Sequence, residues 1–373
     1  MSALPYIDSF RDPVLGRSLL ADLSRQAKGL PRTPVRIMEF CGGHTHAFHR
    51  FGLLGLLPPE IRMVHGPGCP VCVLPKGRID AAIALSLKKE VTLVTYGDLL
   101  RVPGSHGMTL MKARSQGADV RIIVSAMEGL ALAQKCPDRE VVFFAIGFET
   151  TTPPTAAALL EARRQDLGNY SVFANHVLTP PAMKAILSDT ALDGIVGPSH
   201  VSTVIGSRAY DFVARDHGVP LVVAGFEPLD ILLALRMILA QISEGRSEVE
   251  NEYTRAVVPE GNPRSLSLME RVFEIAPEFE WRGFGLLPES SLGIRDEFSF
   301  FDARKRFDVR IGSVSDPGLC ECGEILKGLK SPRDCRIFGT LCTPDTPVGA
   351  CMVSAEGACA AVFHYGDRQG AVS

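Results

Sequence analysis

Short runs of β-branched, aliphatic and aromatic residues recur along the first two thirds of the chain, separated by longer stretches with helical spacing. Several of the short runs are apolar at nearly every position, which is typical of parallel strands covered on both faces. The predicted strands are Val35–Phe40, Ile61–His65, Val91–Tyr96, Val120–Ser125, Val141–Ile146, Tyr170–Ala174, Gly194–Val196 and Leu221–Ala224.

The stretches between these runs predict helices. Within 77–90, for example, the apolar residues fall on one stripe of a helix. Further helices are predicted over Thr151–Arg164, Ser202–His217 and Pro228–Ile242. A repeated strand–helix pattern indicates an α/β fold with mostly parallel, Rossmann-like sheets.

The length of 373 residues predicts two such sheets, one before and one after residue 118. After Ser243 the regular pattern ends, and the last fifty or so residues are rich in Gly, Pro and Cys. We therefore expect two α/β domains, 1–118 and 119–242, followed by a smaller irregular domain over 243–373.

Charge and hydropathy exclude several classes of protein. The net charge is −3, and no long basic run is present, so nucleic acid and anionic membranes are poor candidates for a partner. Met1–Pro13 has no apolar region of the kind that a signal peptide needs. The most apolar long stretch, 219–242, is interrupted by Glu227, Asp230 and Arg236. The sequence predicts a soluble, cytoplasmic protein.

Unusual residues follow five of the predicted strands. Ligands of open parallel sheets bind beyond the carboxyl ends of the strands, so these loops predict one cleft built from several segments. Each loop combines Gly or Pro with a polar or thiol side chain: Cys41–His46, Gly66–Cys72, Gly147–Thr151, Gly197–His200 and Gly225–Pro228. Glu149, in the third loop, is interpreted either as a base or as a residue that satisfies backbone N–H groups at a helix start.

The first two loops carry three cysteines. Cys69 and Cys72 form a Cys-x-x-Cys pair, which suits either the chelation of a soft metal or cycling between dithiol and disulfide. Cys41 lies on the neighbouring loop, and His44 follows it closely. A structural zinc site that includes one of the nearby histidines is the main alternative.

Six more cysteines lie within the last 54 residues: Cys320, Cys322, Cys335, Cys342, Cys351 and Cys359. After one Cys-x-Cys the gaps are wide and uneven, which favours an iron–sulfur cluster over the paired knuckles of a zinc ribbon. Zinc remains open as an alternative, and a disulfide framework is disfavoured in a reducing compartment. Cys136 stands alone and is interpreted as a bystander.

These motifs together resemble the HypD family of hydrogenase maturation factors. The matching segments are Cys-Gly-Gly-His-Thr-His at 41–46, Gly-Pro-Gly-Cys-Pro-Val-Cys at 66–72, Gly-Phe-Glu-Thr-Thr at 147–151, Gly-Pro-Ser-His-Val-Ser at 197–202, Cys-Glu-Cys-Gly-Glu at 320–324, Cys-Thr-Pro at 342–344 and the stretch 351–359. The resemblance spans nearly the whole chain.

The resemblance implies a role in building the Fe(CN)2CO unit of nickel–iron hydrogenases. It implies a complex with a small HypC-type chaperone, iron held by the thiolate of Cys41, and cyanide delivered as a thiocyanate by a HypE-type partner. It also implies a 4Fe–4S cluster, whose ligand pattern falls on Cys320, Cys335, Cys342 and Cys359. Cys322 and Cys351 then remain as an extra pair.

Three hypotheses follow for function. The first is an assembly scaffold without free-standing turnover, in which the cluster, Cys322 and Cys351 pass electrons to Cys69 and Cys72, and His44 moves a proton or orients cyanide. The second is an iron–sulfur thiol–disulfide reductase, which has no need of Cys41. The third is a zinc-stapled binding module without chemistry, which predicts a colourless protein.

Overall fold

The computed structural model describes residues 7–312, 314 and 318–366, and its strands form two sheets. The five-stranded sheet has the order β2-β1-β7-β8-β9, and all its neighbouring pairs are parallel. Its strands are β1 (Val35–Glu39), β2 (Ile61–His65), β7 (Gly194–Gly197), β8 (Leu221–Val223) and β9 (Val249–Asn251).

The six-stranded sheet has the order β10-β11-β6-β5-β3-β4. Its first four strands in the chain pair in parallel, and the hairpin of the last two pairs antiparallel with itself and with β6. The strands are β3 (Val91–Thr95), β4 (Asp119–Ile122), β5 (Glu140–Gly147), β6 (Tyr170–Val177), β10 (Phe273–Trp281) and β11 (Gly285–Ile294). The predicted α/β fold with two mostly parallel sheets is confirmed.

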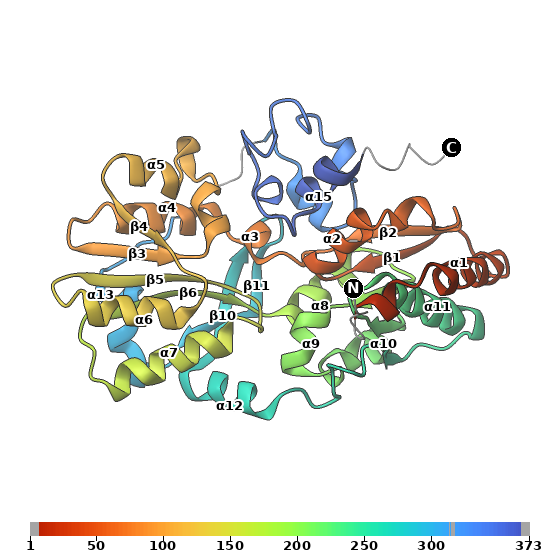
Figure 1. The fold of residues 1–373 in the computed structure, drawn as a ribbon, viewed down its shortest axis with the longest axis horizontal. Coiled ribbons are helices and arrows are strands. Elements are labelled where there is room, and N and C mark those ends of the chain that lie inside the picture. The colour runs from red at the N-terminus through yellow and green to blue at the C-terminus, as the bar shows by residue number, and fades with distance from the viewer. Residues whose placement is uncertain (1–6, 313, 315–317, 367–373) are drawn as a thin grey trace.

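The expected division of the sheets at residue 118 is wrong, because the chain passes between the sheets three times. After β2 it builds β3 to β6 in the other sheet, returns for β7 to β9, and crosses again to add β10 and β11 (Figure 1). The hairpin therefore completes a sheet, although its residues fall within the segment 243–373 that was expected to be irregular. A strand–helix repeat identifies strands, but it does not say which sheet each strand joins.

Both sheets place their parallel strands in the same order. Counted along the chain within each sheet, the parallel strands run 2-1-3-4, and a fifth extends the first sheet. In this arrangement the connections leave to opposite sides of the first strand, so a crevice opens between strands 1 and 3 at their carboxyl ends. The two crevices lie beyond β1 and β7 in one sheet, and beyond β3 and β5 in the other.

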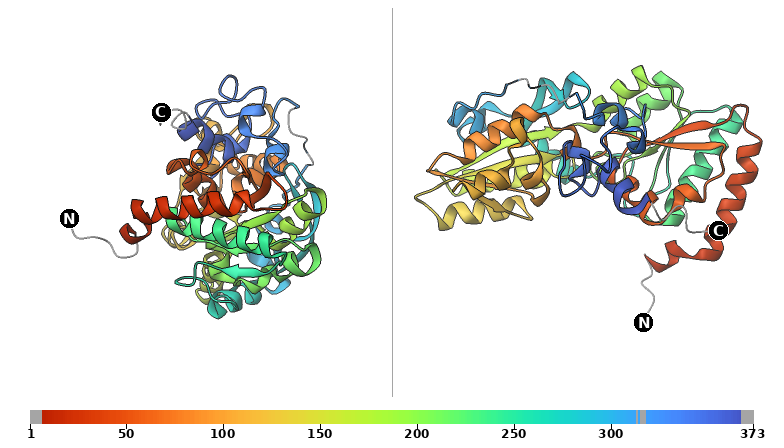
Figure 2. Two further views of the ribbon diagram at one scale, coloured as in Figure 1. Left: turned by 90° about the vertical axis from the view of Figure 1, so that its right-hand side faces the viewer. Right: turned by 90° about the horizontal axis from the view of Figure 1, so that it is seen from above.

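Helices cover both faces of each sheet (Figure 1, Figure 2). Helices α1, α2 and α11 share a core with one face of the five-stranded sheet, and α6 and α7 share one with the six-stranded sheet. The helices are α1 (Pro13–Lys28), α2 (Gly42–Arg50), α3 (Pro70–Val73), α4 (Lys76–Ser86), α5 (Leu110–Ser115), α6 (Ala126–Lys135), α7 (Thr152–Arg164), α8 (Thr179–Asp189), α9 (Ser199–Ile205), α10 (Asp211–His217), α11 (Pro228–Glu244), α12 (Pro263–Val272), α13 (Ala303–Arg306), α14 (Cys322–Leu326) and α15 (Ala358–Tyr365).

Local sequence explains where several helices begin. Helix α11 starts with Pro228 at its first position, and the side chains of Glu227 and Asp230 form a capping box there. Ser125 caps α6 by accepting a hydrogen bond from the Met127 N–H.

No helix in the described ranges has the length and apolar character needed to cross a membrane.

The described part of the last fifty residues forms a lobe of short helices and loops, which we call the C-terminal lobe (318–366). It lies over the junction between the two halves of the molecule (blue in Figures 1 and 2). Its apolar residues, including Ile325, Ile337 and Val353, belong to the same hydrophobic cluster as Phe40 of one half and Phe144 of the other. The lobe is therefore packed into the core between the two sheets.

The packing of α11 on the five-stranded sheet gives a prediction for stability. Ile238 is fully buried there, whereas Ile122, on the edge strand β4, is 54% exposed. Ile238→Ala leaves a cavity and should lower the free energy of unfolding by about 2–5 kcal/mol. Urea denaturation of the two matched variants tests this, since Ile122→Ala should cost much less. Equal losses would contradict the assigned packing.

Candidate functional site

Two thiol loops meet at the carboxyl ends of β1 and β2. The strands pair in parallel with Glu39 opposite His65, so the segments that follow them leave the sheet side by side. The Gly42 N–H donates to the carbonyl of Gly68 at 3.0 Å. A Cβ on Gly68 would lie 2.5 Å from the Cα of Cys41, so only glycine allows this approach of the two backbones.

Cys69 and Cys72 form a disulfide bond, with their Cα atoms 5.3 Å apart. Cys69 is the residue before the short helix α3, its sulfur accepts a hydrogen bond from the Cys72 N–H at 3.3 Å, and both residues are buried. The structure thus shows the oxidised form of a Cys-x-x-Cys pair beside the backbone of Cys41. The two loops that carry these three cysteines therefore lie side by side.

Cys41 immediately precedes α2 and is a buried thiol. Burial raises the pKa of this thiol to about 12, and the negative charge of nearby Glu356 adds to the rise, while the backbone N–H groups of Gly43 and His44 oppose it. The thiol is therefore protonated at neutral pH when no cation is bound. A metal cation that binds there must displace the proton.

Glu39 is a buried carboxylate that sequence reasoning missed. It is fully buried, and it accepts hydrogen bonds from the Cys41 N–H at 3.1 Å, from the Thr45 hydroxyl and from His65 Nδ1 at 2.8 Å. Burial raises the pKa of Glu39, and the hydrogen bond from His65 counteracts part of this rise. An acidic residue at the inward-facing end of an apolar strand was the only signal in the sequence.

His44 connects Cys41 to two further loops of the predicted cleft. Its Nε2 lies 2.9 Å from the Gly225 carbonyl and 3.1 Å from Ser199 Oγ. Donation to the carbonyl leaves the lone pair on Nδ1, which is buried and has no hydrogen-bond partner within the described residues. Burial lowers the pKa of His44 to about 4, so the imidazole is neutral and its Nδ1 is available as an acceptor.

Glu149 lies beyond β5, at the crevice of the six-stranded sheet. Both carboxylate oxygens accept hydrogen bonds from Thr179, one from the backbone N–H and one from the hydroxyl, each at 2.8 Å. Glu149 thus accepts hydrogen bonds at the N-terminus of α8, rather than at the N-terminus of α7, the helix that follows it in the sequence. Burial raises its pKa to about 7. Burial raises the pKa of Tyr210 well above its usual range, and Glu149 adds to the rise where it is ionised.

The six cysteines of the C-terminal lobe line one small cavity of about 10 Å³, together with apolar side chains such as Ile325, Ile337 and Phe338. Gly349 allows the sulfur of Cys320 to approach, since a Cβ there would overlap it. The N–H of Val348 lies 3.3 Å from the sulfur of Cys342. Within the described residues, no three His, Cys, Asp or Glu side chains are arranged to hold one metal ion.

Cys322 and Cys351 are in direct contact inside this cavity. Cys322 accepts a hydrogen bond from the Cys320 thiol, which lowers the pKa of Cys322. The hydrogen bond between Cys322 and Cys351, together with burial, raises this pKa by more, so the pKa of Cys322 is raised overall. Cys351 is in turn hydrogen-bonded to Cys359. A continuous row of thiols therefore runs through the lobe.

The lobe packs directly against the disulfide segment. The short helix η8 (Ala350–Met352), which carries Cys351, contacts α3, which carries Cys72. The Arg282 N–H donates to the carbonyl of Val73 at 2.8 Å and ties a third segment to this junction.

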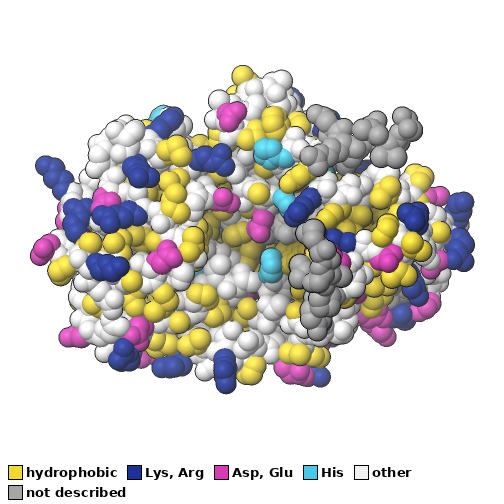
Figure 3. All heavy atoms as spheres, viewed as in Figure 1, with side chains coloured by type: hydrophobic (Ala, Val, Ile, Leu, Met, Phe, Trp, Pro, Cys, Tyr) yellow, Lys and Arg dark blue, Asp and Glu magenta, His cyan; other side chains and the backbone are white. Residues whose placement is uncertain are grey.

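On one face of the molecule, histidine and acidic side chains gather at the middle, below the lobe (Figure 3).

The fold and this site define a two-sheet α/β protein with a buried thiol–disulfide centre and an adjoining cluster of six thiols. The sequence matches the model of the HypD family, described as the hydrogenase formation hypA family, over residues 15–366. The chain therefore belongs to the HypD family of hydrogenase maturation factors.

Individual relatives are similar over almost their full length. The hydrogenase maturation factor HypD of Azotobacter vinelandii is 55% identical, covering 99% of this chain and 99% of the relative. The factors of the same name from Rhizobium leguminosarum bv. viciae and Escherichia coli (strain K12) are 53% and 44% identical, covering 97% and 98% of this chain and 96% and 99% of the relatives.

The raised pKa of Glu149 predicts a pH-dependent stability. The pKa is about 7 in the folded protein and about 4.3 in an unfolded chain. Folding therefore takes up a proton between these values, and this contribution to stability is lost as the pH rises through about 7. Glu149→Gln removes the effect and should be more stable than the wild type at pH 8, by up to about 3 kcal/mol, with no such gain near pH 4.5.

Urea denaturation at several pH values measures this difference. Glu270→Gln, an exposed glutamate on α12, is the matched control and should follow the wild type throughout. A difference between Glu149→Gln and the wild type that stays constant with pH would contradict the assignment.

Proposed function

We propose that this chain is an assembly protein of hydrogenase maturation that holds iron on Cys41 while the Fe(CN)2CO unit is built. The observation that carries the proposal is the placement of buried Cys41 beside the Cys69–Cys72 disulfide, at the crevice of the five-stranded sheet. The family resemblance supplies the partners: a HypC-type chaperone that shares the iron and a HypE-type donor of cyanide.

Iron is the substrate at this site, and the surrounding residues suit its binding. The Cys41 thiol must lose its proton when iron binds, because the thiolate is the ligand. Neutral His44, three residues along α2, has a buried Nδ1 lone pair that can accept a proton or a hydrogen bond from a ligand of the iron. Glu39 fixes the backbone N–H of Cys41 and thereby orients the loop.

The thiols of the C-terminal lobe fit a resident iron–sulfur cluster, because they line one apolar cavity and Cys342 has a backbone N–H directed at its sulfur. By the family pattern Cys320, Cys335, Cys342 and Cys359 would hold a 4Fe–4S cluster, which supplies electrons one at a time when bound.

Cys322 and Cys351 remain as a dithiol in contact with each other. They can exchange with the Cys69–Cys72 disulfide: two thiols are oxidised to a new disulfide, and two thiols are released at Cys69 and Cys72. No proton or electron is left over in this exchange. The contact of η8 with α3 places the two segments together.

The oxidised Cys69–Cys72 pair also favours a second candidate function, an iron–sulfur thiol–disulfide reductase. The two functions differ at Cys41, which a reductase does not need. A zinc-stapled binding module differs from both, since it would contain no sulfide. The many thiols of the chain fit a reducing compartment, and we therefore propose a cytoplasmic location.

Metal and sulfide contents of the protein, purified without oxygen, test the proposal. The wild type should be brown, with broad absorption near ~400 nm, about four sulfides per chain and iron in excess of the cluster. Cys41→Ser should lose the excess iron and keep the sulfide. Cys335→Ser should lose the sulfide. Cys136→Ser, at the end of α6 and outside both sites, should match the wild type.

The three functions predict different metal and sulfide contents. Iron content that is the same in Cys41→Ser and the wild type would overturn the assembly role and leave the reductase. A colourless protein with zinc and no sulfide would overturn both and leave the binding module.

The exchange between the two thiol pairs predicts a second result. Cys351→Ser prevents the transfer of a disulfide from Cys69–Cys72, so assembly that needs this reduction should slow by about tenfold or more. Infrared bands of iron-bound cyanide and carbon monoxide, followed in a mixture of the maturation proteins, measure the rate. Cys136→Ser serves as the control, and an undiminished rate in both Cys351→Ser and Cys322→Ser would rule out the exchange.

A further inference from the structure

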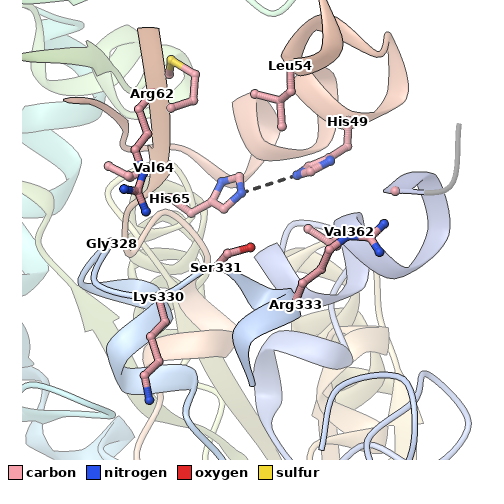
Figure 4. A pocket seen from close by; sticks show the side chains of 12 residues that line it. His49, Leu54, Arg62, Val64, His65, Gly328, Lys330, Ser331, Arg333 and Val362 are labelled. Atoms are coloured by element: carbon pink, nitrogen blue, oxygen red, sulfur yellow. Dashed lines mark hydrogen bonds between the residues drawn. The ribbon is translucent and has the colours of Figure 1, made fainter. Parts of the chain in front are cut away.

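A second cavity, of about 190 Å³, lies between the end of β2 and the C-terminal lobe. It is lined by His49, Arg62, His65, Lys330, Ser331 and Arg333, among others, and is large enough for several water molecules or a small ion. Figure 4 shows the two histidines facing each other, with Arg62 and Arg333 on either side of them. The proposed assembly role uses none of these lining residues.

The lining of this cavity is cationic. Three of its side chains are Arg or Lys, and none is Asp or Glu. Lys330 forms an ion pair with Glu321 at 2.5 Å and points away from the histidines, so its charge is balanced outside the cavity. Arg62 makes no ion pair within the described part of the chain, whereas Arg333 has a further interaction of its own. Clustered cationic side chains of this kind favour an anion and oppose a metal cation.

His49 provides an independent sign of a missing ligand. It is 4% exposed, and its Nδ1 is buried without a hydrogen-bond partner among the described residues. Burial lowers the pKa of His49 to about 3, and the charges of His65 and Arg333 lower it further. A bound anion would counteract both charges and could accept a hydrogen bond from the imidazole.

Hydrogen bonds connect this cavity to the thiol site. His49 Nε2 lies 3.4 Å from His65 Nε2, and His65 Nδ1 lies 2.8 Å from the carboxylate of Glu39. The same carboxylate accepts a hydrogen bond from the Cys41 N–H at 3.1 Å. Four residues from three neighbouring segments therefore form one polar path from the cavity to the Cys41 loop.

We propose that this cavity binds a small oxyanion, held by Arg62, Arg333 and His49, and that its binding alters the Cys41 loop through His65 and Glu39. The anion is of the phosphate or carboxylate class, for which the planar guanidinium of arginine is the best-suited side chain. The site goes beyond the proposed assembly role and does not depend on it, because neither iron nor a cluster is needed for the anion to bind.

Isothermal titration of the full chain with inorganic phosphate, at constant ionic strength, tests the binding site. We expect saturable binding of one phosphate per chain. Arg62→Gln should weaken it by about tenfold or more, since a charged hydrogen bond is lost. His49→Gln should also weaken it. Arg236→Gln, an exposed arginine on α11, is the matched control and should bind as the wild type does. Absent saturation, or equal affinity in Arg62→Gln, would overturn the site.

Thiol labelling tests the connection to Cys41. The rate of Cys41 alkylation by iodoacetamide, read from its peptide by mass spectrometry, should change at saturating phosphate in the wild type and not in Arg62→Gln. The rate at Cys136 should stay constant in both. Bound phosphate without any change at Cys41 would overturn the connection.

The same titration distinguishes the source of the anion. A nucleoside triphosphate that competes with phosphate and binds more tightly would assign the cavity to the phosphate end of a nucleotide. Phosphate binding without such competition would assign it to a free oxyanion.

Discussion

The parallel pairing of β1 with β2 is the contact on which the thiol site depends. Its register sets Glu39 opposite His65, and the chain leaves both strands at the same edge of the sheet. The two following loops must then share one space, which the absence of a side chain at Gly68 provides. Because β1 is also the strand at which the sheet order reverses, this space opens into the crevice where α/β sheets bind ligands.

Burial then determines the chemistry that this position can support. Cys41, His44 and Glu39 are all buried, and in each case burial favours the neutral form. The protonated thiol of Cys41 and the neutral imidazole of His44 carry no charge in this low-dielectric site, but the thiol becomes a strong ligand once a cation displaces its proton. The hydrogen bonds to Glu39 and from His44 hold the loop in place before any ligand arrives, so little reorganisation is needed on binding.

The sequence predicted the strands far better than their arrangement. The strand over Val141–Ile146 was evident because its buried residues are apolar on both faces, whereas the hairpin β10–β11 has many exposed positions and lacks that signal. Residue spacing also revealed that Cys41 and the Cys69–Cys72 pair follow adjacent elements. It did not reveal the role of Glu39, because a single carboxylate in an apolar run does not indicate which side chains it contacts. His65 is identified as its partner only by the register of β1 and β2.

The position of the C-terminal lobe shows why the whole chain is needed for the site. The described part of the lobe contains no strand longer than a single bridge, and its apolar side chains belong to the core between the two sheets. Segments of this size rarely bury enough apolar surface to fold alone. Its thiols therefore converge only when both sheets are in place, and the crossings of the chain between the sheets link these parts into one structure. Glu356 of the lobe lies against Gly42, so the lobe also closes the side of the Cys41 loop that the sheets leave open.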